Sequence, residues 1–575
     1  MAHQQATRTR RVWLPAAAFS LLALVVLARL VQLQVLDHER YAAQARSELR
    51  GSDTLFARRG AILDRNGAVL AISVDTWDFY VAARVWREDD VARRGSEAIA
   101  KVTGLDPAQL REDVRTSGLV DVLVARDVPY EAGRGLLDAG VPGLVALPNT
   151  ERVYPGGDVA ASIIGITGLD NTGLTGIEAW YDDLLQGTPG RVIFERDTTG
   201  SPIPYGVFFT TEPKPGSDVV LTIDRRLQEI AERTLAIALE EHSARGGAIL
   251  MMDPRSGEIL ALATTPGLLY STLDLSDAAQ ADLLRNRAVT DLYEPGSVMK
   301  VITAAAAIDA GLVSADTEYV DTGIVRIYEV EIRNWSDGVY GTQTMTGVLQ
   351  HSINTGAVFM AEKLGAHRFQ EYLDAFGFGE ATGIDLNGEA TGILRRPEDP
   401  LWSPVDLATQ AFGQSISVTP IQMATAVGAA INGGLLLRPR LVSATVAADG
   451  TAHDHRTEVL GRPISPESSD TIRAMMGAVI DPGWFHPGKP KLYTAGGKSG
   501  TASVPIPNGY DDSQIASFVG FAPLDEPQIL ILVKLDENRD FLTGTAAAGP
   551  IFADLVDEVL PYLRVPPDVA LAAAR

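Results

Sequence analysis

The sequence predicts an α+β protein with one membrane-spanning helix near its N-terminus, and three observations lead to this fold class. A single long apolar run lies within the first 36 residues. Short strand-like segments punctuated by Gly and Pro fill residues 37–215. Beyond them, strand-like segments enclose helical sequence, which is typical of an α+β domain with a mainly antiparallel sheet flanked by helices.

Composition excludes several classes of function. The 73 acidic and 49 basic side chains give a net charge of −24, which argues against broad nucleic-acid binding because that needs a basic surface. Without cysteine the chain has no disulfide, thiolate metal site or cysteine nucleophile. The 8 histidines form no metal-binding motif, and the nearest pair, His453 and His455, stands in a polar stretch. We therefore expect neither a metal nor a cofactor.

Lysine is rare in this chain. Only 8 of the 49 basic residues are lysines, and the other 41 are arginines. Because arginine stays charged whereas a buried lysine can lose its proton, a position that keeps lysine is a candidate for proton transfer.

The N-terminal segment is predicted to anchor the chain in the cell membrane. Residues 1–11 form a basic tail, and residues 12–35 are mostly apolar, with Arg29 as the one charged residue, whose side chain can reach the interface. Basic residues ahead of the span predict a cytoplasmic N-terminus and a single-pass protein whose residues after 36 lie on the extracytoplasmic face. The alternative is a cleaved signal peptide, but the small-x-small site at 43–45 lies well beyond the apolar run.

Residues 36–215 predict an elongated α+β module without a catalytic motif. Asn66-Gly67 predicts a tight hairpin, and 210–218 has the composition of a linker. The acidic pairs Glu88-Asp89 and Glu112-Asp113 stand in charged, solvent-like contexts without a nearby histidine. We therefore predict no catalytic site in this module.

A second domain is predicted over residues 216–565, and residues 566–575 are predicted to form a C-terminal tail. Residues 218–224 predict a strand ending at Asp224, which can cap the helix that follows. Further predicted elements are a hairpin over 246–264, strands over 516–523 and 528–537, and a closing helix over 547–563.

Three short patterns in this domain indicate nucleophilic catalysis. Pro295-Gly296 leads into Ser297 and an Ala-rich helix, so Ser297 and Lys300 are predicted to lie one turn apart on one helix face. A serine needs a base, and a lysine kept neutral by burial and neighbouring cations can be that base. The helix start also offers N–H groups to an oxyanion. The patterns are Ser297-Val298-Met299-Lys300, Ser352-Ile353-Asn354 and Lys498-Ser499-Gly500-Thr501.

The third pattern is predicted to lie on or beside a strand. Gly496-Gly497 predicts a turn before it, and 502–504 predicts a strand after it. Gly500 would let a substrate approach a strand edge closely. The hydroxyls of Ser499 and Thr501 could hold a carboxylate.

In this order, S-x-x-K, S-x-N and K-[ST]-G resemble the penicilloyl serine transferases, which are penicillin-binding proteins and serine β-lactamases. Over about 30–560 the chain more closely resembles the class B penicillin-binding proteins, monofunctional transpeptidases that cross-link peptidoglycan. The resemblance implies a dimerisation-type pedestal at 36–215 and a penicillin-binding transpeptidase domain at 216–565. One departure is Ser415, where many relatives have glycine. The stretches that carry the resemblance are 58–71, 152–165, 173–190, 221–228, 286–300, 412–424 and 516–523.

The resemblance also implies catalytic roles. Ser297 attacks the carbonyl of the penultimate D-alanine in a D-Ala-D-Ala stem peptide, the terminal D-alanine leaves, and an amine of a neighbouring stem resolves the acyl-enzyme. Lys300 is the base for Ser297. Ser352 and Lys498 relay the proton to the leaving amine.

Substrate contacts follow from the same resemblance. Asn354 orients the peptide amide, and Ser499 and Thr501 bind the terminal carboxylate beside Gly500. The N–H groups of Ser297 and Thr501 form the oxyanion hole. β-Lactam antibiotics acylate the same serine as mimics of the substrate.

The implied partner is a polytopic membrane glycan polymerase of the SEDS type, contacted through the span and the membrane-near pedestal, together with other division or elongation proteins. Chain length and the module's motifs favour a division role over an elongation role. One alternative is a D,D-carboxypeptidase or β-lactamase, which the pedestal and anchor disfavour. Another is a non-catalytic β-lactam sensor or scaffold, which the single span and the complete motifs disfavour.

Overall fold

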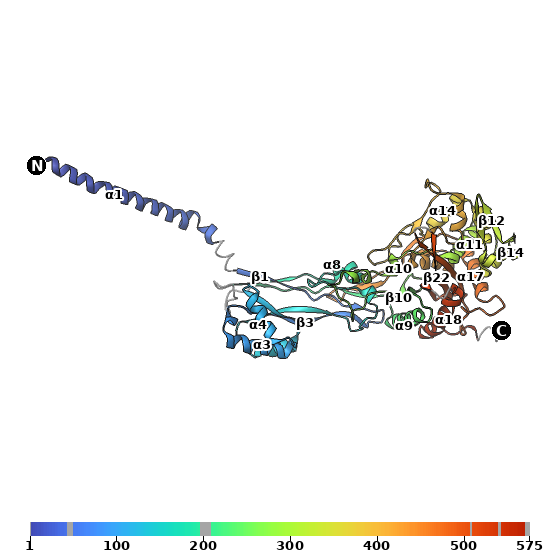
Figure 1. Cartoon of the computed structure of the whole chain (residues 1–575), viewed down its shortest axis with the longest axis horizontal. Helices are drawn as coiled ribbons and strands as arrows, with labels where there is room; N and C mark the ends of the chain where they lie inside the picture. Colours follow the sequence, from blue (N-terminus) through green and yellow to red (C-terminus); the bar gives the residue numbers. More distant parts are fainter. Residues whose placement is uncertain (1, 43–49, 196–208, 507–508, 539–541, 570–575) are drawn as a thin grey trace. The chain divides into compact units, whose positions relative to one another are not determined.

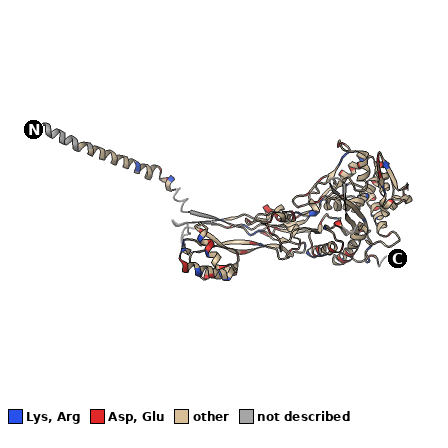
Figure 2. Ribbon diagram, viewed as in Figure 1, with Lys and Arg blue, Asp and Glu red and all other residues tan. Residues whose placement is uncertain are grey.

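A computed structural model gives the fold of the chain, drawn in Figure 1. It describes residues 2–42, 50–195, 209–506, 509–538 and 542–569. Within these residues, one helix is long and apolar enough to cross a membrane. This 22-residue segment, Pro15–Leu36, comprises the second half of α1 (Ala2–Val31) and a π-helical turn, Gln32–Leu36. It agrees with the predicted span, and Figure 2 shows it free of charge over most of its described length.

The chain folds into two compact units that alternate along the sequence. The segments 59–73 and 152–187, which lie in the predicted pedestal, belong to the same unit as the predicted catalytic domain. Unit 1 comprises Met1–Arg58, Val74–Glu151 and Thr188–Lys214, and unit 2 comprises Arg59–Ser73, Arg152–Gly187 and Pro215–Arg575.

Unit 1 has a mixed α and β core. The C-terminal part of β3 (Val69–Ala82) pairs with β4 (Asp121–Pro129), and β5 (Leu144–Val153) also pairs with β3. Phe79, Val81 and Trp86 are buried among residues from the helices of this unit. The acidic pairs predicted to be solvated are exposed. The other elements are β1 (Arg50–Leu55), β6 (Gly190–Glu195), β7 (Phe209–Thr211), α3 (Asp89–Thr103), α4 (Pro107–Thr116) and α5 (Tyr130–Asp138).

Unit 2 contains a five-stranded antiparallel sheet in the order β10-β9-β23-β22-β21, which confirms the predicted sheet type. The β9–β10 hairpin and the β22–β23 pair were both predicted from the sequence. Because β21 has a neighbour on one side only, one edge of this strand is left open. The strands are β9 (Gly246–Met252), β10 (Ile259–Thr265), β21 (Gly496–Ile506), β22 (Gly509–Ala522) and β23 (Ile529–Asn538).

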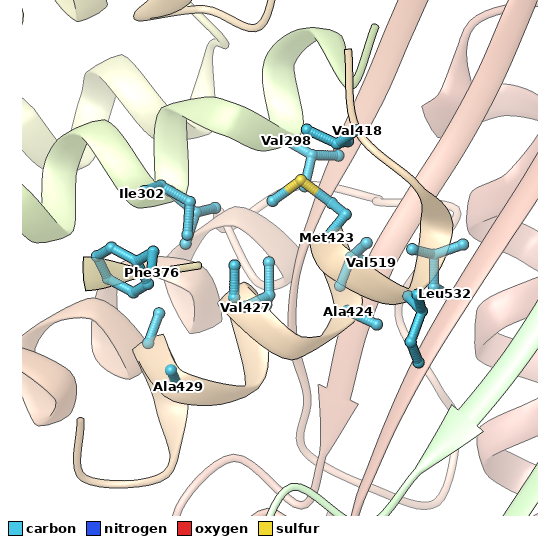
Figure 3. Close-up of a cluster of buried hydrophobic side chains, with 14 of the residues drawn as sticks. Val298, Ile302, Phe376, Val418, Met423, Ala424, Val427, Ala429, Val519 and Leu532 are labelled. Atoms are coloured by element: carbon cyan, nitrogen blue, oxygen red, sulfur yellow. The ribbon is translucent and has the colours of Figure 1, made fainter. Parts of the chain in front are cut away.

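Both faces of this sheet are buried, since successive side chains of each strand pack into different cores. Ile249 and Val533 pack with α9 (Arg225–Glu241) and α18 (Gly544–Tyr562). Leu250, Val519 and Leu532 belong to the core on the other face. There, α16 (Pro420–Ile431) lies between the sheet and α11 (Met299–Asp309), and Figure 3 shows Met423 and Val427 of α16 in this core.

Smaller elements complete unit 2. At the start of the unit, β2 (Ile62–Leu63) pairs with β3 through the predicted hairpin, where Gly67 has a φ of +84°. The remaining strands are β8 (Asp218–Leu221), β11 (Glu318–Asp321), β12 (Ile324–Ile327), β13 (Val330–Arg333), β14 (Gly341–Thr344), β15 (Ile393–Leu394), β16 (Ile416–Ser417), β17 (Leu436–Leu437), β18 (Val442–Val446), β19 (Ala452–Asp454) and β20 (Val459–Gly461). The remaining α-helices are α6 (Ala161–Ile164), α7 (Gly176–Trp180), α8 (Asp182–Leu185), α10 (Arg287–Thr290), α12 (Met345–Gln350), α13 (Asn354–Leu364), α14 (Ala366–Ala375), α15 (Pro404–Gln410) and α17 (Pro466–Ile480).

A buried ionic cluster ties the early segments of unit 2 together. Arg59 Nε lies 2.5 Å from Glu178 Oε2, and Arg152 Nε lies 2.7 Å from Glu178 Oε1. Arg59 Nη1 also pairs with Asp182 at 2.6 Å. The two guanidinium groups therefore share one carboxylate that is shielded from water, which fixes the segments that carry them.

Three sequence predictions have clear outcomes here. Asp224 caps α9 as predicted, accepting from the N–H groups of Arg226 and Leu227. The closing helix starts at Gly544, three residues before the predicted start at residue 547. The turn predicted at Gly496-Gly497 is wrong, because both residues lie in β21. They are glycines since phenyl rings of the neighbouring strand occupy the space where a Cβ would stand, 2.4 Å and 2.7 Å away.

Candidate active site

Ser297 lies in a tight turn that begins a buried helix. The 3₁₀ turn Gly296–Val298 leads directly into α11, whose second residue is Lys300. Gly296 has a φ of +56° and its N–H donates to the carbonyl of Gly413 at 3.0 Å. A Cβ on Gly413 would stand 2.1 Å from the Gly296 oxygen. Two glycine backbones in close contact therefore hold the serine turn in place.

Ser352 lies between α12 and α13 in a strained backbone conformation. Its φ is +57°, in the left-handed region that residues with a side chain rarely adopt. Such strain persists only where the surroundings impose it, and it occurs most often at functional sites. Asn354, two residues on, begins α13 and donates from Nδ2 to the carbonyl of Arg333 at 2.8 Å.

Two buried lysines meet at the Ser352 hydroxyl. Lys300 Nζ donates to Ser352 Oγ at 3.2 Å, to the Ser352 carbonyl at 2.6 Å and to Asn354 Oδ1 at 2.7 Å. Lys498 Nζ donates to Ser352 Oγ at 3.0 Å and to the Ser499 carbonyl at 3.1 Å. All of these acceptors are uncharged. The Ser352 oxygen accepts from both lysines, so its own hydrogen is left for another acceptor.

This environment lowers the pKa of both lysines. Burial, followed by the charge of Lys498, holds the pKa of Lys300 well below its ordinary value. Burial lowers the pKa of Lys498 to about 7. His486 also lies close enough to Lys498 for that charge, after burial, to lower the pKa of its imidazole. At least one lysine amine can therefore be neutral, and so basic, near neutral pH.

The third pattern lies on the edge strand β21. The Thr545 hydroxyl donates to Ser499 Oγ at 2.9 Å, and the N–H of Gly544 donates to Thr501 Oγ1 at 3.0 Å. At Gly500, a Cβ would stand 2.6 Å from the Pro295 carbonyl oxygen. The missing side chain at Gly500 therefore accommodates Ser517 as well as the segment before Ser297, and the predicted close approach of a substrate stays a prediction.

A cavity of about 450 Å³ brings the three patterns together. Ser297, Ser352, Asn354, Ser499 and Thr501 all line it, while Lys300, Lys498 and Gly500 are buried behind its wall. Within the part of the chain that the structure describes, the Ser297 hydroxyl has no hydrogen bond, so it is not paired with Lys300. Hydrogen bonds of catalytic groups are often formed only once a substrate is bound.

Sequence reasoning missed several residues of this cavity. Thr543 and Thr545 line it from the start of α18, next to Ser499 and Thr501, and Glu331 and Arg333 line it from β13. Neither pair stands near a motif in the sequence. Gly413, which contacts the Ser297 turn, lies in the stretch 412–424 that carried the family resemblance. The sequence therefore marked this residue but did not show what it does.

The structure also explains why position 415 suits glycine. Ser415 has a φ of +57°, and its N–H donates to Glu294 Oε1 at 2.9 Å. The left-handed conformation is therefore needed here, and serine adopts it at a cost that glycine avoids. Among the described residues, no group of three or more acidic, histidine or cysteine side chains could hold a metal ion.

Fold and cavity together define a class of protein. The parts are a serine at the start of a buried helix, buried lysines that donate to neutral oxygens, and an edge strand with hydroxyl side chains. Together they form a serine acyltransferase of the penicillin-recognising type.

Comparison with known proteins identifies the family. Residues 54–221 match the family described as the penicillin-binding protein dimerisation domain, and residues 247–557 match the penicillin binding protein transpeptidase domain. The chain is 33% identical to stage V sporulation protein D of Bacillus subtilis, over 95% of this chain and 84% of that protein. It is 30% identical to the peptidoglycan D,D-transpeptidase FtsI of Escherichia coli, over 95% of this chain and 91% of that protein.

Solved structures agree. Penicillin-binding protein 2X of Streptococcus thermophilus superposes with a TM-score of 0.76 at 25% identity, over 89% of this chain and 80% of that one. Penicillin-binding protein 3 of Mycobacterium tuberculosis, complexed with aztreonam, superposes with a TM-score of 0.68 at 27% identity, over 90% of this chain and 98% of that one. The chain belongs to the class B penicillin-binding proteins, which confirms the resemblance seen in the sequence.

Proposed function

We propose that this protein is a peptidoglycan D,D-transpeptidase that cross-links stem peptides through an acyl-enzyme on Ser297. Relatives named as D,D-transpeptidases and the matched transpeptidase domain support the reaction class. The observation that carries the residue assignment is a pair of buried lysines that both donate to the Ser352 hydroxyl and that, among the described residues, have no acidic partner.

In the acylation step, the neutral amine of Lys300 takes the proton of the Ser297 hydroxyl while Oγ attacks the carbonyl carbon of the penultimate D-alanine. The N–H groups of Ser297 and Thr501 stabilise the oxyanion. The C–N bond then breaks, and the departing D-alanine nitrogen receives the Ser352 hydrogen, which Lys498 replaces. The product is an ester between Ser297 and the donor peptide.

In the second step, an amine of a neighbouring stem attacks the ester carbonyl. The amine loses a proton to the Ser352–lysine chain, the C–O bond breaks, and Ser297 Oγ regains a hydrogen. No atoms of water are consumed, so one peptide bond is exchanged for another. Asn354 holds the donor amide, and Ser499 and Thr501 hold the terminal carboxylate until the D-alanine leaves.

Labelling by a fluorescent penicillin tests this function. We expect the full-length protein to be acylated once, at Ser297, and to stay acylated for a long time because water is a poor acceptor at a transpeptidase site. Ser297→Ala should abolish labelling. Labelling that survives this substitution would refute the assignment, and rapid release of hydrolysed penicillin would favour a β-lactamase or carboxypeptidase.

For the cellular setting, we propose a single-pass protein with a cytoplasmic N-terminus that acts at the division septum beside a polytopic glycan polymerase. The apolar segment Pro15–Leu36 and the basic residues ahead of it support the topology. A cross-linker held beside the polymerase meets new strands at a high effective concentration. Replacing the span with an unrelated one should weaken co-purification with the polymerase, and a fluorescent fusion should gather at midcell. Sidewall fluorescence would contradict the septal role.

A further inference from the structure

Hydroxyl side chains from two separate segments, joined by hydrogen bonds, line one part of the cavity. Ser499 and Thr501 stand on β21, and Thr543 and Thr545 stand at the start of α18. The β21 pair is proposed to bind the carboxylate of the acyl donor. The α18 pair has no role in that mechanism, although it faces the same space.

The hydrogen bonds decide how the β21 hydroxyls can act. A hydroxyl can donate one hydrogen and accept others, so its use toward an anion depends on which function is already occupied. Thr545 donates to Ser499 Oγ at 2.9 Å, and the Gly544 N–H donates to Thr501 Oγ1 at 3.0 Å. Both β21 oxygens therefore accept from α18 and keep their own hydrogens. Within the described ranges of the chain, no acceptor receives either hydrogen.

A carboxylate in this part of the cavity needs such donors. Burial lowers the pKa of Lys498 to about 7, so this amine is not a permanently charged partner for an anion near neutral pH. Arg333, which also lines the cavity, is already paired with Glu331 at 2.7 Å and Asp337 at 3.2 Å. The start of α18, a 19-residue helix, adds a partial positive charge but cannot by itself fix the direction of a hydroxyl.

We propose that Thr545 is a positioning residue for the substrate carboxylate. Its hydroxyl occupies the acceptor side of Ser499 Oγ, so the Ser499 hydrogen is directed to the terminal carboxylate of the acyl donor. Thr545 acts through Ser499 and does not touch the reacting atoms. This inference rests on the proposed function, which supplies an acyl donor with a terminal carboxylate.

The consequence is selective. Without the Thr545 hydroxyl, the Ser499 hydroxyl can rotate and donate its hydrogen to another acceptor. An acyl donor that ends in a carboxylate then binds more weakly. A donor without that charge gains little from Ser499 in either case. Ser297, Lys300 and Ser352 keep their contacts, so the chemical step itself is preserved.

A matched pair of thioester acyl donors tests this on the full-length protein. One donor ends in a free carboxylate, and the other is its methyl ester. Thr545→Val keeps the branched shape and removes the hydroxyl, whereas Thr545→Ser keeps the hydroxyl. We expect Thr545→Val to lower kcat/KM for the carboxylate donor about tenfold, mainly through KM, and to change the ester by less than about twofold. Thr545→Ser should stay close to wild type.

Thr471→Val is the matched control, because the Thr471 hydroxyl bonds the Glu467 carbonyl on an exposed face of α17. Equal losses for both donors in Thr545→Val, or no loss for either, would overturn the inference. Thr545→Ala, with the same expected selectivity, covers the case in which the valine variant melts below the assay temperature. Failure of the proposed function looks different, since wild type would then react with neither donor, or Ser297→Ala would react with both.

Discussion

Two groups of buried cations in unit 2 are built in opposite ways. Arg59 and Arg152 share the carboxylate of Glu178, and the side chains of Arg59 and Glu178 are 0% exposed. Lys300 and Lys498 are as well buried, at 0% and 1% exposed, but their partners are neutral oxygens. A cation shielded from water needs either a counter-ion or the loss of its proton. The arginine group has a counter-ion, whereas the lysine group has lowered pKa values and so releases a proton more readily.

This difference separates structure from chemistry. An arginine cannot give up its proton, so a buried arginine must bring an acid with it, and the pair stays fixed. A buried lysine without an acid is poised to exchange a proton, which is what acyl transfer needs. In a chain with 41 arginines and 8 lysines, the lysines at 300 and 498 are therefore informative residues.

The largest effect should come from making the lysine group resemble the arginine group. Lys300→Arg keeps the charge but removes the base, because a guanidinium does not deprotonate near neutral pH. We expect acylation by fluorescent penicillin to fall at least about 10³-fold, within the range of general-base contributions. The far-UV circular dichroism and the melting temperature should show that the variant is folded. Acylation close to wild type in a folded variant would refute the role of Lys300 as base.

The converse change breaks the arginine group. Glu178→Gln leaves two buried guanidinium groups without their shared carboxylate, and we expect it to cost about 3–5 kcal/mol of stability. Thermal unfolding of the full-length protein measures this as a lower melting temperature, with acylation retained below it. Glu112→Gln, which breaks an exposed pair with Arg115, is the control and should leave the melting temperature unchanged. Equal melting temperatures for both variants would contradict the contrast between the two groups.

A third change tests the coupling between the lysines. The charge of Lys498 helps to lower the pKa of Lys300, so Lys498→Met should raise that pKa. Because the neutral amine of Lys300 is the active form, the rate is lost as pH falls through this pKa, and the acid limb should move to higher pH. We also expect an overall loss of about 10²-fold from the missing proton relay. If the acid limb of the pH–rate profile of Lys498→Met, scaled to its own maximum, lies at the same pH as that of the wild type, the two lysines titrate independently.

The smallest effect should come from a lysine outside the site. Lys489 is partly exposed and pairs with Asp481 at 2.8 Å, an arrangement that arginine can also make. We expect Lys489→Arg to change the acylation rate by less than about twofold, since exposed ion pairs contribute little. A large loss here would mean that arginine is poorly tolerated at lysine positions generally, which would remove the meaning of Lys300→Arg.

Local patterns in the sequence were sufficient to predict the sheet type, the membrane helix, the cap at Asp224 and the family. These features depend on neighbours close in sequence or on motifs that the family shares. The three patterns also gave Ser297, Ser352, Asn354, Ser499 and Thr501 of the cavity wall and the two lysines behind it, but not Thr543, Thr545, Glu331 or Arg333, which line the same cavity. Their catalytic roles stay a proposal that the labelling experiments test.

Contacts between distant segments could not be predicted in this way. Gly496 and Gly497 suggest a turn locally, but the rings of Phe518 and Phe521 on the neighbouring strand make them strand residues. The left-handed backbone of Ser352 is imposed by packing, because serine has no intrinsic preference for it. Thr545 meets Ser499 across 46 positions of the chain, so no local pattern signals their hydrogen bond.

The contact between Gly296 and Gly413 constrains how this protein can vary. A side chain at position 413 would collide with the Gly296 carbonyl and displace the turn that carries Ser297. A mutation there could shut out an inhibitor only by disabling the enzyme. Substitutions are accommodated more easily where the cavity wall is made of side chains, such as those of the β13 residues Glu331 and Arg333. The backbone contact between Gly296 and Gly413 therefore tolerates almost no substitution at position 413.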